Sequence, residues 1–389
     1  MGELFLLPRA DRRVRLGHAW VFSNEVDISR SPLTAFTPGE ITVVRDAFGK
    51  PVGTAYVNPG ALICARILTS DAKATIDREW WAARFRRAVA LRDRVYPTPH
   101  YRAVYGESDG CPGLVVDRYG DVLVAQLNTA GIVRMRAAIV EALQAAFKPR
   151  GILLRSAGSV RQIEGIDEFD EAIGDVPDAA DVEEDNALFS APLRKGQKTG
   201  YFFDQRDNRS RLARYVCGRT VLDMYSYIGS WGVRAARFGA SNVTCSDSSQ
   251  LALEYAQENA ARNGVDVQTR LGDALDVLSE YAADGRRFDV VIVDPPALIK
   301  RRKDVAAGQA HYERLNRLAF NVLAEDGILV SCSCSHHLEQ AMLQRAILGA
   351  AKDAGRRVQL LEKHAHAPDH PIHPAMPETE YLKAFFVRG

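Results

Sequence analysis

Short apolar runs alternate with turn-forming residues over the first part of the chain. The runs cover residues 41–44, 52–57 and 62–68, and an Asn-Pro-Gly tripeptide at 58–60 separates the last two. Glycine and proline interrupt strands and favour turns, so a run bounded by them is typical of a short strand. The pattern predicts a small β-domain over residues 1–72.

A longer apolar period follows and predicts a helix from Asp77 to about Val95. A second helix is expected at 132–146, and strands at 113–116, 122–127 and 152–155. Together these elements predict a compact α+β domain over residues 73–185.

An acidic stretch closes this central domain. No Lys or Arg occurs from Glu164 to Asp185, and Gly-Asp-Val-Pro stands at 174–177. Because glycine and proline break regular structure, we predict a linker at this point.

Strand and helix patterns alternate regularly over residues 186–389. A helix is expected after Ser230 and another over 250–263. Alternation of this kind predicts an α/β fold with a seven-stranded, doubly wound, Rossmann-like sheet. In such a sheet the ligand site lies beyond the carboxyl ends of the strands, where the strand order reverses. The expected strands cover residues 221–224, 242–246, 267–271, 288–293, 327–333, 357–362 and 381–387.

The composition is that of a soluble globular protein, with 47% hydrophobic and 25% charged residues among 389. This length predicts two or three domains. No window approaches the ~18 apolar residues of a membrane span, and the apolar stretch at 4–7 is too short for a signal-peptide core. The six cysteines form no C-x-x-C pair. We therefore expect reduced thiols, no metal site, no membrane partner and a cytoplasmic location.

The formal net charge is only +1, so any RNA-binding surface must be local. Arginines cluster at positions 9, 12, 13 and 15 and again at 84, 86, 87, 92 and 94. The clusters fit either a basic RNA-binding face or ordinary solvated helices, and both interpretations remain open at this point.

Acidic residues stand at the ends of three successive expected strands, at Asp223, Asp247 and Asp273. A single such acid usually caps a helix or ends a strand, but three in register favour a ligand. S-Adenosylmethionine matches them, because it has a sulfonium and an ammonium group, a ribose diol for Asp247 and an adenine edge for Asp273. Gly229 serves the turn after the first strand, and the absence of a G-x-G-x-x-G loop disfavours a dinucleotide.

Chemistry at the same sheet edge is predicted by the next two strands. The fourth strand ends in Asp294-Pro-Pro, where two prolines stiffen the backbone and orient the carboxylate. The fifth ends in Ser-Cys-Ser-Cys-Ser, with Cys332 and Cys334 on one face if extended. Free cysteine is usually a small buried hydrophobe, but two beside an acid favour a nucleophile.

A cysteine nucleophile and a nearby acid suit methylation of cytosine C5. A thiolate that adds to C6 makes C5 nucleophilic, and Asp294 is the candidate acid near N3. A base must then remove the C5 proton, and the candidates are Glu378, Glu380 and His337.

Three runs carry a resemblance to a known family: GHAWVFSNE at 17–25, GESDGCPGLVVDRYG at 106–120 and KTGYFFDQR at 198–206. Through them the chain resembles the PUA-containing bacterial 23S ribosomal RNA cytosine-C5 methyltransferases, over nearly its whole length. The resemblance implies a β-barrel PUA domain that binds RNA, a central domain, and a class I methyltransferase domain over 186–389. It also implies ribosomal RNA as the partner and Cys334 as the nucleophile. The cofactor contacts that it implies are Gln205, Tyr225, Ser230 and Asp247.

Two departures from the family keep alternatives open. Ala297-Leu298 follows Asp-Pro-Pro where the family has Lys-Phe, and Cys332 is an additional cysteine. Guanine-N7 methylation without a covalent intermediate is the nearest alternative, and an inactive RNA-binding assembly factor is another. Whether the chain is a monomer or a homodimer is also open.

Overall fold

The computed structural model describes residues 2–156 and 159–389. The chain divides into two compact units. The first comprises Met1–Ala180, Pro192–Phe203 and Pro368–Thr379, and the second Asp181–Ala191, Asp204–Ala367 and Glu380–Gly389. The predicted β-domain and central domain therefore belong to one unit, and two later segments of the chain join it.

The first unit begins with a five-stranded sheet in the order β1-β3-β4-β5-β2. Its neighbours are antiparallel except for β1 and β3, which are parallel. Alternate residues of these strands, such as Val44, Ala55 and Cys64, are buried in one core. The β-domain expected from the alternation is thus observed. Its elements are β1 Gly2–Phe5, α1 Asp11–Arg15, β2 Trp20–Phe22, β3 Glu40–Arg45, β4 Pro51–Val57 and β5 Ile63–Thr69.

A second five-stranded sheet of the first unit has the order β10-β9-β8-β7-β6. Trp81 and Phe85 of α2 and Leu143 of α4 pack with buried residues of its strands. The predicted α+β domain is therefore observed as well. Its elements are α2 Arg78–Val95, β6 His100–Tyr105, β7 Leu114–Tyr119, β8 Val122–Leu127, α3 Ala130–Arg134, α4 Arg136–Phe147, β9 Gly151–Ser156, α5 Ser159–Glu164 and β10 Phe169–Gly174.

The acidic stretch is mostly regular structure, which corrects the expectation of a linker. Strand β10 pairs antiparallel with β9, and β11 (Ala179–Glu184) pairs with β12 (Ala187–Pro192). The cations that the stretch lacks come from elsewhere in the chain: Arg155 pairs with Asp170 at 2.8 Å and Arg209 with Glu184. The break between β10 and β11 has the irregular structure that Gly-Asp-Val-Pro predicts.

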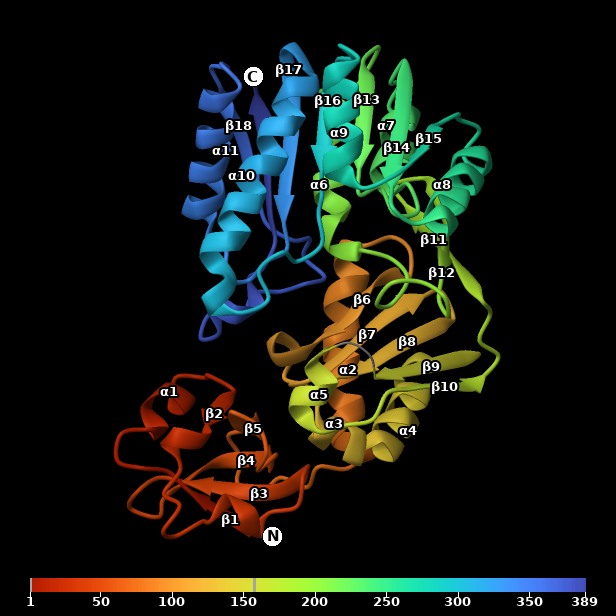
Figure 1. Ribbon diagram of the computed structural model, residues 1–389. Helices are drawn as coiled ribbons and strands as arrows, with labels where there is room; N and C mark the ends of the chain where they lie inside the picture. The colour runs from red at the N-terminus through yellow and green to blue at the C-terminus, as the bar shows by residue number, and fades with distance from the viewer. Residues whose placement is uncertain (1, 157–158) are drawn as a thin grey trace. The chain divides into compact units, whose positions relative to one another are not determined.

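The second unit contains a seven-stranded sheet in the order β15-β14-β13-β16-β17-β19-β18. All neighbours are parallel except β19, which is antiparallel to both β17 and β18. The strand order reverses between β13 and β16, as expected for a doubly wound fold (Figure 1). The strands are β13 Thr220–Met224, β14 Asn242–Asp247, β15 Gln268–Leu271, β16 Phe288–Val293, β17 Leu323–Ser333, β18 Gln359–His364 and β19 Lys383–Arg388.

Helices cover both faces of this sheet (Figure 1). On one face α7 and α8 contribute Trp231 and Leu253 to the core, and on the other α9, α10 and α11 contribute Val277, Leu315 and Leu343. None of the helices in the described part of the chain is long and apolar enough to cross a membrane. The helices of this unit are α6 Arg206–Arg211, α7 Ser230–Arg237, α8 Gln250–Arg262, α9 Ala274–Ala283, α10 Val305–Val322 and α11 Gln340–Asp353.

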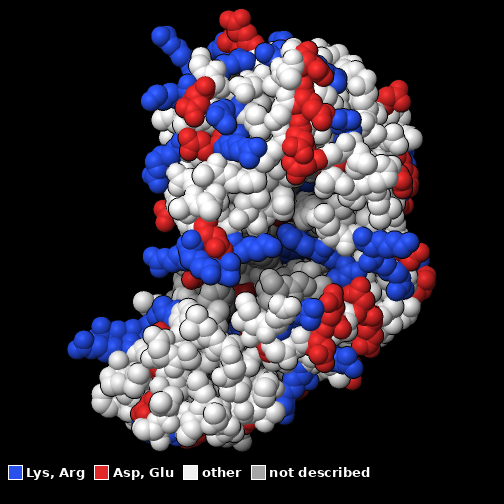
Figure 2. All heavy atoms as spheres, in the orientation of Figure 1, with Lys and Arg blue, Asp and Glu red and all other residues white. Residues whose placement is uncertain are grey.

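Basic and acidic side chains share the surface, as the small net charge requires. Figure 2 shows both basic and acidic side chains on the face turned to the viewer. A run of four basic residues, at 300–303, immediately precedes α10, and all four are exposed. Arg301 pairs with Asp304 at 2.9 Å, and the other three form no ion pair within the described residues.

Candidate cofactor and catalytic site

Three of the predicted acids meet at the carboxyl ends of the central strands. Asp223 lies near the end of β13, Asp247 ends β14 and Asp294 directly follows β16. Burial raises the pKa of Asp223 well above its usual value, and the charges of Asp294 and Asp247 raise it further. The three carboxyl groups therefore interact at the point where the strand order reverses.

A tight loop between β13 and α7 shapes one wall of the site. Tyr225, Tyr227 and Gly229 have positive φ angles of 61°, 48° and 78°. A Cβ atom on Gly229 would lie 2.9 Å from the Cβ of Ala256 in α8, so this position requires glycine. Ser230, buried, is the first residue of α7. The glycine expected at the turn therefore has a structural reason.

Backbone amides orient two of the acids. Asp223 Oδ2 accepts from the amide of Gly232 at 2.9 Å. The Asp247 carboxylate accepts from the amides of Tyr227 and Ser249, both at 2.9 Å. Each carboxylate oxygen has a further lone pair, so Asp247 retains the capacity to accept from a diol.

Asp273 has a structural role as a helix cap. It is exposed and precedes α9, where its side chain accepts from the amide of Leu275 at 2.9 Å. Capping accounts for an acid at this position by itself. Its expected contact with adenine stays a prediction.

Buried polar atoms at this edge indicate a polar ligand. Among the described residues, Asp223 Oδ1, Ser226 Oγ and Ser246 Oγ are buried without a hydrogen-bond partner. Each such atom costs about 1–3 kcal/mol if nothing pairs with it. A ligand with several donors, one of them cationic, would satisfy them and would favour the ionised form of Asp223. The residues present therefore fit S-adenosylmethionine.

Asp294 is held through both carboxylate oxygens. Gln205 Nε2 donates to one and Trp231 Nε1 to the other, each at 3.0 Å. Burial raises the pKa of Asp294 to about 6, although the hydrogen bond from Trp231 lowers it. Gln205 was expected to contact the cofactor. Its amide instead donates to Asp294 and accepts from Asn208 at 2.8 Å, and the cofactor contact stays a prediction.

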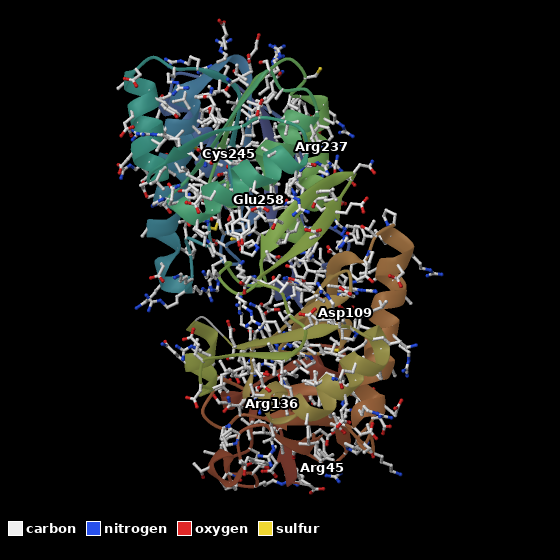
Figure 3. All side chains as sticks on the ribbon, turned by 90° about the vertical axis from the view of Figure 1, so that its right-hand side faces the viewer. Arg45, Asp109, Arg136, Arg237, Cys245 and Glu258 are labelled. Carbon is white, nitrogen blue, oxygen red and sulfur yellow. The ribbon has the colours of Figure 1, made fainter. Side chains whose placement is uncertain are left out.

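The two cysteines of the fifth strand have different environments. Cys332 is completely buried in β17, and burial, followed by the charge of Asp294, raises its pKa well above the usual value. Cys334 lies just beyond the strand, is half-buried, and its Sγ is 3.8 Å from the carbonyl oxygen of Pro295. A reactive thiolate needs access to solvent and a low pKa. Cys332 has neither, so it is a buried packing residue like Cys245, which Figure 3 labels within the second unit.

The three candidate bases are dispersed. Glu378 belongs to the first unit, where its carboxylate is 3.9 Å from the His18 ring. Glu380 is exposed, and His337 is half-buried beside His336, with ring centroids 5.2 Å apart. The geometry singles out none of them.

Three groups of this site were not predicted from the sequence. Trp231 reads as an ordinary helix residue, and Tyr312 as part of the apolar face of α10. The Tyr312 hydroxyl accepts from Ser333 Oγ at 2.9 Å and is 3.1 Å from Ser335 Oγ. Lys383 reads as a polar residue of a strand, yet it is buried at the start of β19. No local pattern distinguishes these residues, because their partners come from distant parts of the chain.

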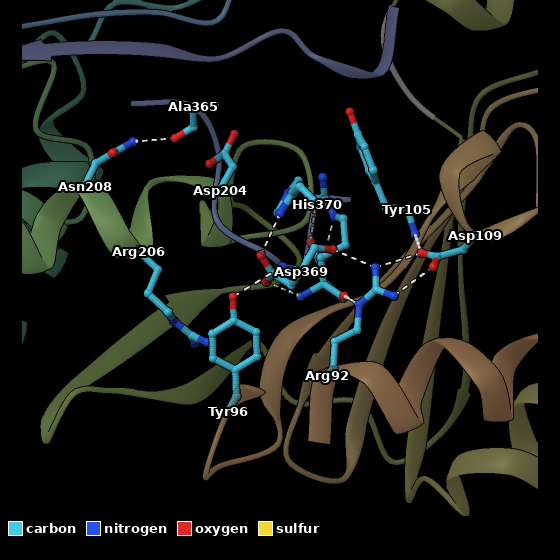
Figure 4. A network of polar contacts seen from close by, with 12 residues as sticks. Arg92, Tyr96, Tyr105, Asp109, Asp204, Arg206, Asn208, Ala365, Asp369 and His370 are labelled. Carbon is cyan, nitrogen blue, oxygen red and sulfur yellow. Dashed lines mark hydrogen bonds and ion pairs between the residues drawn. The ribbon is translucent and has the colours of Figure 1, made fainter. Parts of the chain in front are cut away.

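Not all arginines of the two clusters are available to form the expected basic face. Arg13 pairs with Glu25 at 2.9 Å. Arg92 is completely buried, where both terminal nitrogens bind the Asp109 carboxylate, at 2.7 and 2.8 Å, and one also donates to the Asp369 carbonyl (Figure 4). Arg92 is therefore structural and cannot contact RNA. The exposed members of the clusters are Arg9, Arg12, Arg15, Arg86, Arg87 and Arg94.

Family models match two regions of the chain. A model of a PUA-like domain matches residues 4–70, and one of an S-adenosylmethionine-dependent methyltransferase matches residues 167–388. The second match covers more than half of the chain and includes every predicted cofactor and catalytic residue.

Known proteins similar to the chain match it over its full length. Ribosomal RNA large subunit methyltransferase I of Aeromonas salmonicida is 34% identical, over 99% of each chain. The protein of the same name from Shewanella denitrificans is 36% identical, over 98% of each. A solved structure from Streptococcus mutans, assigned as a SAM-dependent methyltransferase, aligns over all of both chains with a TM-score of 0.84 and 19% identity, which shows a common fold.

Proposed function

We propose a specific reaction for this chain, which belongs to the family of S-adenosylmethionine-dependent methyltransferases. The reaction is the transfer of a methyl group to C5 of a cytosine in large-subunit, 23S ribosomal RNA. The names of the relatives support large-subunit ribosomal RNA as the substrate. The observation that carries the choice of cytosine C5 is the half-buried Cys334, whose Sγ contacts the backbone of the Asp294-Pro-Pro segment.

In this reaction Cys334 acts as the nucleophile. S-Adenosylmethionine supplies, when bound, a methyl group on a cationic sulfur. The Cys334 thiolate forms a bond to C6 of the cytosine, and the displaced electron pair makes C5 nucleophilic toward that methyl group. After methylation a base removes the C5 proton, and the electron pair left behind expels the thiolate.

Asp294 acts as the acid at N3 of the cytosine. A carboxyl group with a pKa near 6 gains and loses a proton readily around neutral pH, which suits general acid catalysis. The donors Gln205 and Trp231 bind its two oxygens and so restrict its orientation. Donation of a proton or hydrogen bond to N3 stabilises the negative charge that the ring acquires as the thiolate adds.

RNA recognition is proposed to involve exposed arginines of the first unit and the basic residues 300–303 of the second. The PUA-like domain supports the first part. The second rests on position, because residues 300–303 follow Asp294 closely along the chain and three of them have no ion-pair partner within the described residues. Phosphate groups next to a flipped-out base would meet such cations.

The experiment uses ribosomal RNA that carries 5-fluorocytosine. Fluorine replaces the C5 proton that the base must remove, so the thiolate cannot be expelled after methylation. A covalent protein–RNA adduct should therefore accumulate in the presence of S-adenosylmethionine. Cys334→Ser should abolish the adduct, and the matched variant Cys332→Ser should retain it. Methylation by Cys334→Ser at a rate near that of the unmodified protein would refute the covalent mechanism and favour guanine N7.

A further inference from the structure

Lys383 is a buried cation without an acidic ion-pair partner among the described residues. Only 4% of the residue is exposed, and its Nζ donates to the carbonyl oxygens of Ser335 at 2.7 Å and Tyr381 at 2.8 Å. No carboxylate lies within ion-pair distance of Nζ among the residues that the structure describes. Burying an ammonium group is costly unless an anion accompanies it.

Lys383 is connected to both chain neighbours of Cys334. In the antiparallel pair of β17 and β19 it lies directly opposite Ser333. Its Nζ binds the carbonyl of Ser335 on the other side. The segment 333–335 is held further by Tyr312, whose hydroxyl contacts both serines. The ammonium group is therefore held against the backbone of the segment that carries Cys334.

The charged groups that act on Lys383 are Cys334 and Glu380. Burial raises the pKa of Tyr312 to about 12 and that of Cys332 well above its usual value, so both stay neutral. Glu380 is exposed to solvent, and His336 and His337 follow in the loop after the serines. Burial lowers the pKa of Lys383 to about 8, while the charges of Cys334 and Glu380 raise it.

We propose that the Lys383 ammonium group is the counter-ion of the Cys334 thiolate. In this role Lys383 is a positioning residue: it stabilises the nucleophile before attack on C6 and again when the thiolate leaves. A cation beside a cysteine lowers the pH at which the thiolate forms. The inference rests on the proposed function in one respect, that Cys334 is the nucleophile.

The test is the pH dependence of alkylation of the full-length protein. Iodoacetamide modification of each cysteine is followed by mass spectrometry from about pH 5 to about pH 9. Cys217, whose thiol is exposed, serves as the internal reference. We expect the midpoint for Cys334 to lie about one unit or more below that of Cys217. Equal midpoints for Cys334 and Cys217 in the unmodified protein would overturn the inference before any variant is tested.

Two variants of Lys383 and one control sharpen the test. Lys383→Met should raise the Cys334 midpoint by about one unit or more, whereas Lys383→Arg, which keeps the charge, should preserve most of the shift. The control is Lys363→Met on β18, where the exposed Nζ binds Gln344, and it should change nothing. Binding of S-adenosylmethionine identifies folded variants. A folded Lys383→Met with an unchanged midpoint would overturn the inference.

Failure of the inference and failure of the proposed function are distinguishable, because alkylation requires no RNA. A Lys383-dependent low midpoint supports the ion pair even if 5-fluorocytosine RNA forms no adduct, in which case cytosine C5 is the wrong target. Formation of the protein–RNA adduct, together with a Cys334 midpoint equal to that of Cys217, would leave the proposed function intact and refute the ion pair between Lys383 and Cys334.

Discussion

Replacing Glu184 by Gln is expected to destabilise the second unit by about 3 kcal/mol at neutral pH. Glu184 is buried at the end of β11, and its carboxylate lies 2.5 Å from Arg209, 3.6 Å from Arg206 and 3.7 Å from Arg234. Glutamine keeps the shape and an acceptor oxygen but removes the negative charge. Three buried guanidinium groups then lose the anion that they share.

The magnitude follows from the pKa of Glu184. Burial by itself raises it, but the charge and hydrogen bond of Arg209, with the charges of Arg206 and Arg234, lower the pKa from 4.5 to about 2. The difference, 4.5 − 2, is 2.5 units, and at ~1.36 kcal/mol per unit it corresponds to about 3 kcal/mol. Removal of one partner from a buried ion pair generally costs about 3–5 kcal/mol, in agreement.

The sign of the pH dependence also follows. Because the pKa of Glu184 is lower in the folded state, its contribution is complete above the ordinary value of 4.5 and is lost as the pH falls toward about 2. The difference between the unmodified protein and Glu184→Gln should therefore be largest at neutral pH and shrink in acid.

Urea unfolding followed by tryptophan fluorescence measures this difference, since Trp231 lies in the core of the same unit. The control is Glu258→Gln, an exposed position of α8 that Figure 3 labels, which should change the free energy of unfolding by less than about 0.5 kcal/mol. Equal stability of Glu184→Gln and the unmodified protein, or a difference that grows in acid, would refute the reasoning.

Two further predictions concern ligands. Asp247→Ala should weaken S-adenosylmethionine binding by about 1–3 kcal/mol in calorimetry, because the ribose diol loses its acceptor, and unchanged affinity would remove Asp247 from the site. Neutralising Lys300, Arg302 and Lys303 together should reduce the slope of log RNA affinity against log salt by about two units, at ~0.7 per phosphate contact. Neutralising Arg86, Arg87 and Arg94 measures the contribution of the first unit to the same slope. If the slope is unaltered in either triple variant, the RNA does not bind at the residues changed in it.

Much of the fold could be predicted because it depends on local periodicity. The seven strands of the second unit and the helix at 250–262 were predicted within a few residues. The acidic stretch was predicted wrongly, because its pairing depends on β9 and on arginines distant in the sequence. The membership of Pro192–Phe203 and Pro368–Thr379 in the first unit has no local signal either.

Local sequence patterns were sufficient to predict the alternation of strands and helices, and with it the sheet edge at which Asp223, Asp247 and Asp294 meet. They were sufficient because apolar periodicity and strand-end residues are local properties of the chain. The contacts of the folded chain were needed to show which cysteine is shielded from solvent, which donors hold Asp294, and that Lys383 is bonded to the residue after Cys334. The bond between Lys383 and Ser335 joins residues 48 positions apart. Such contacts depend on the pairing of β17 with β19, which no local pattern specifies.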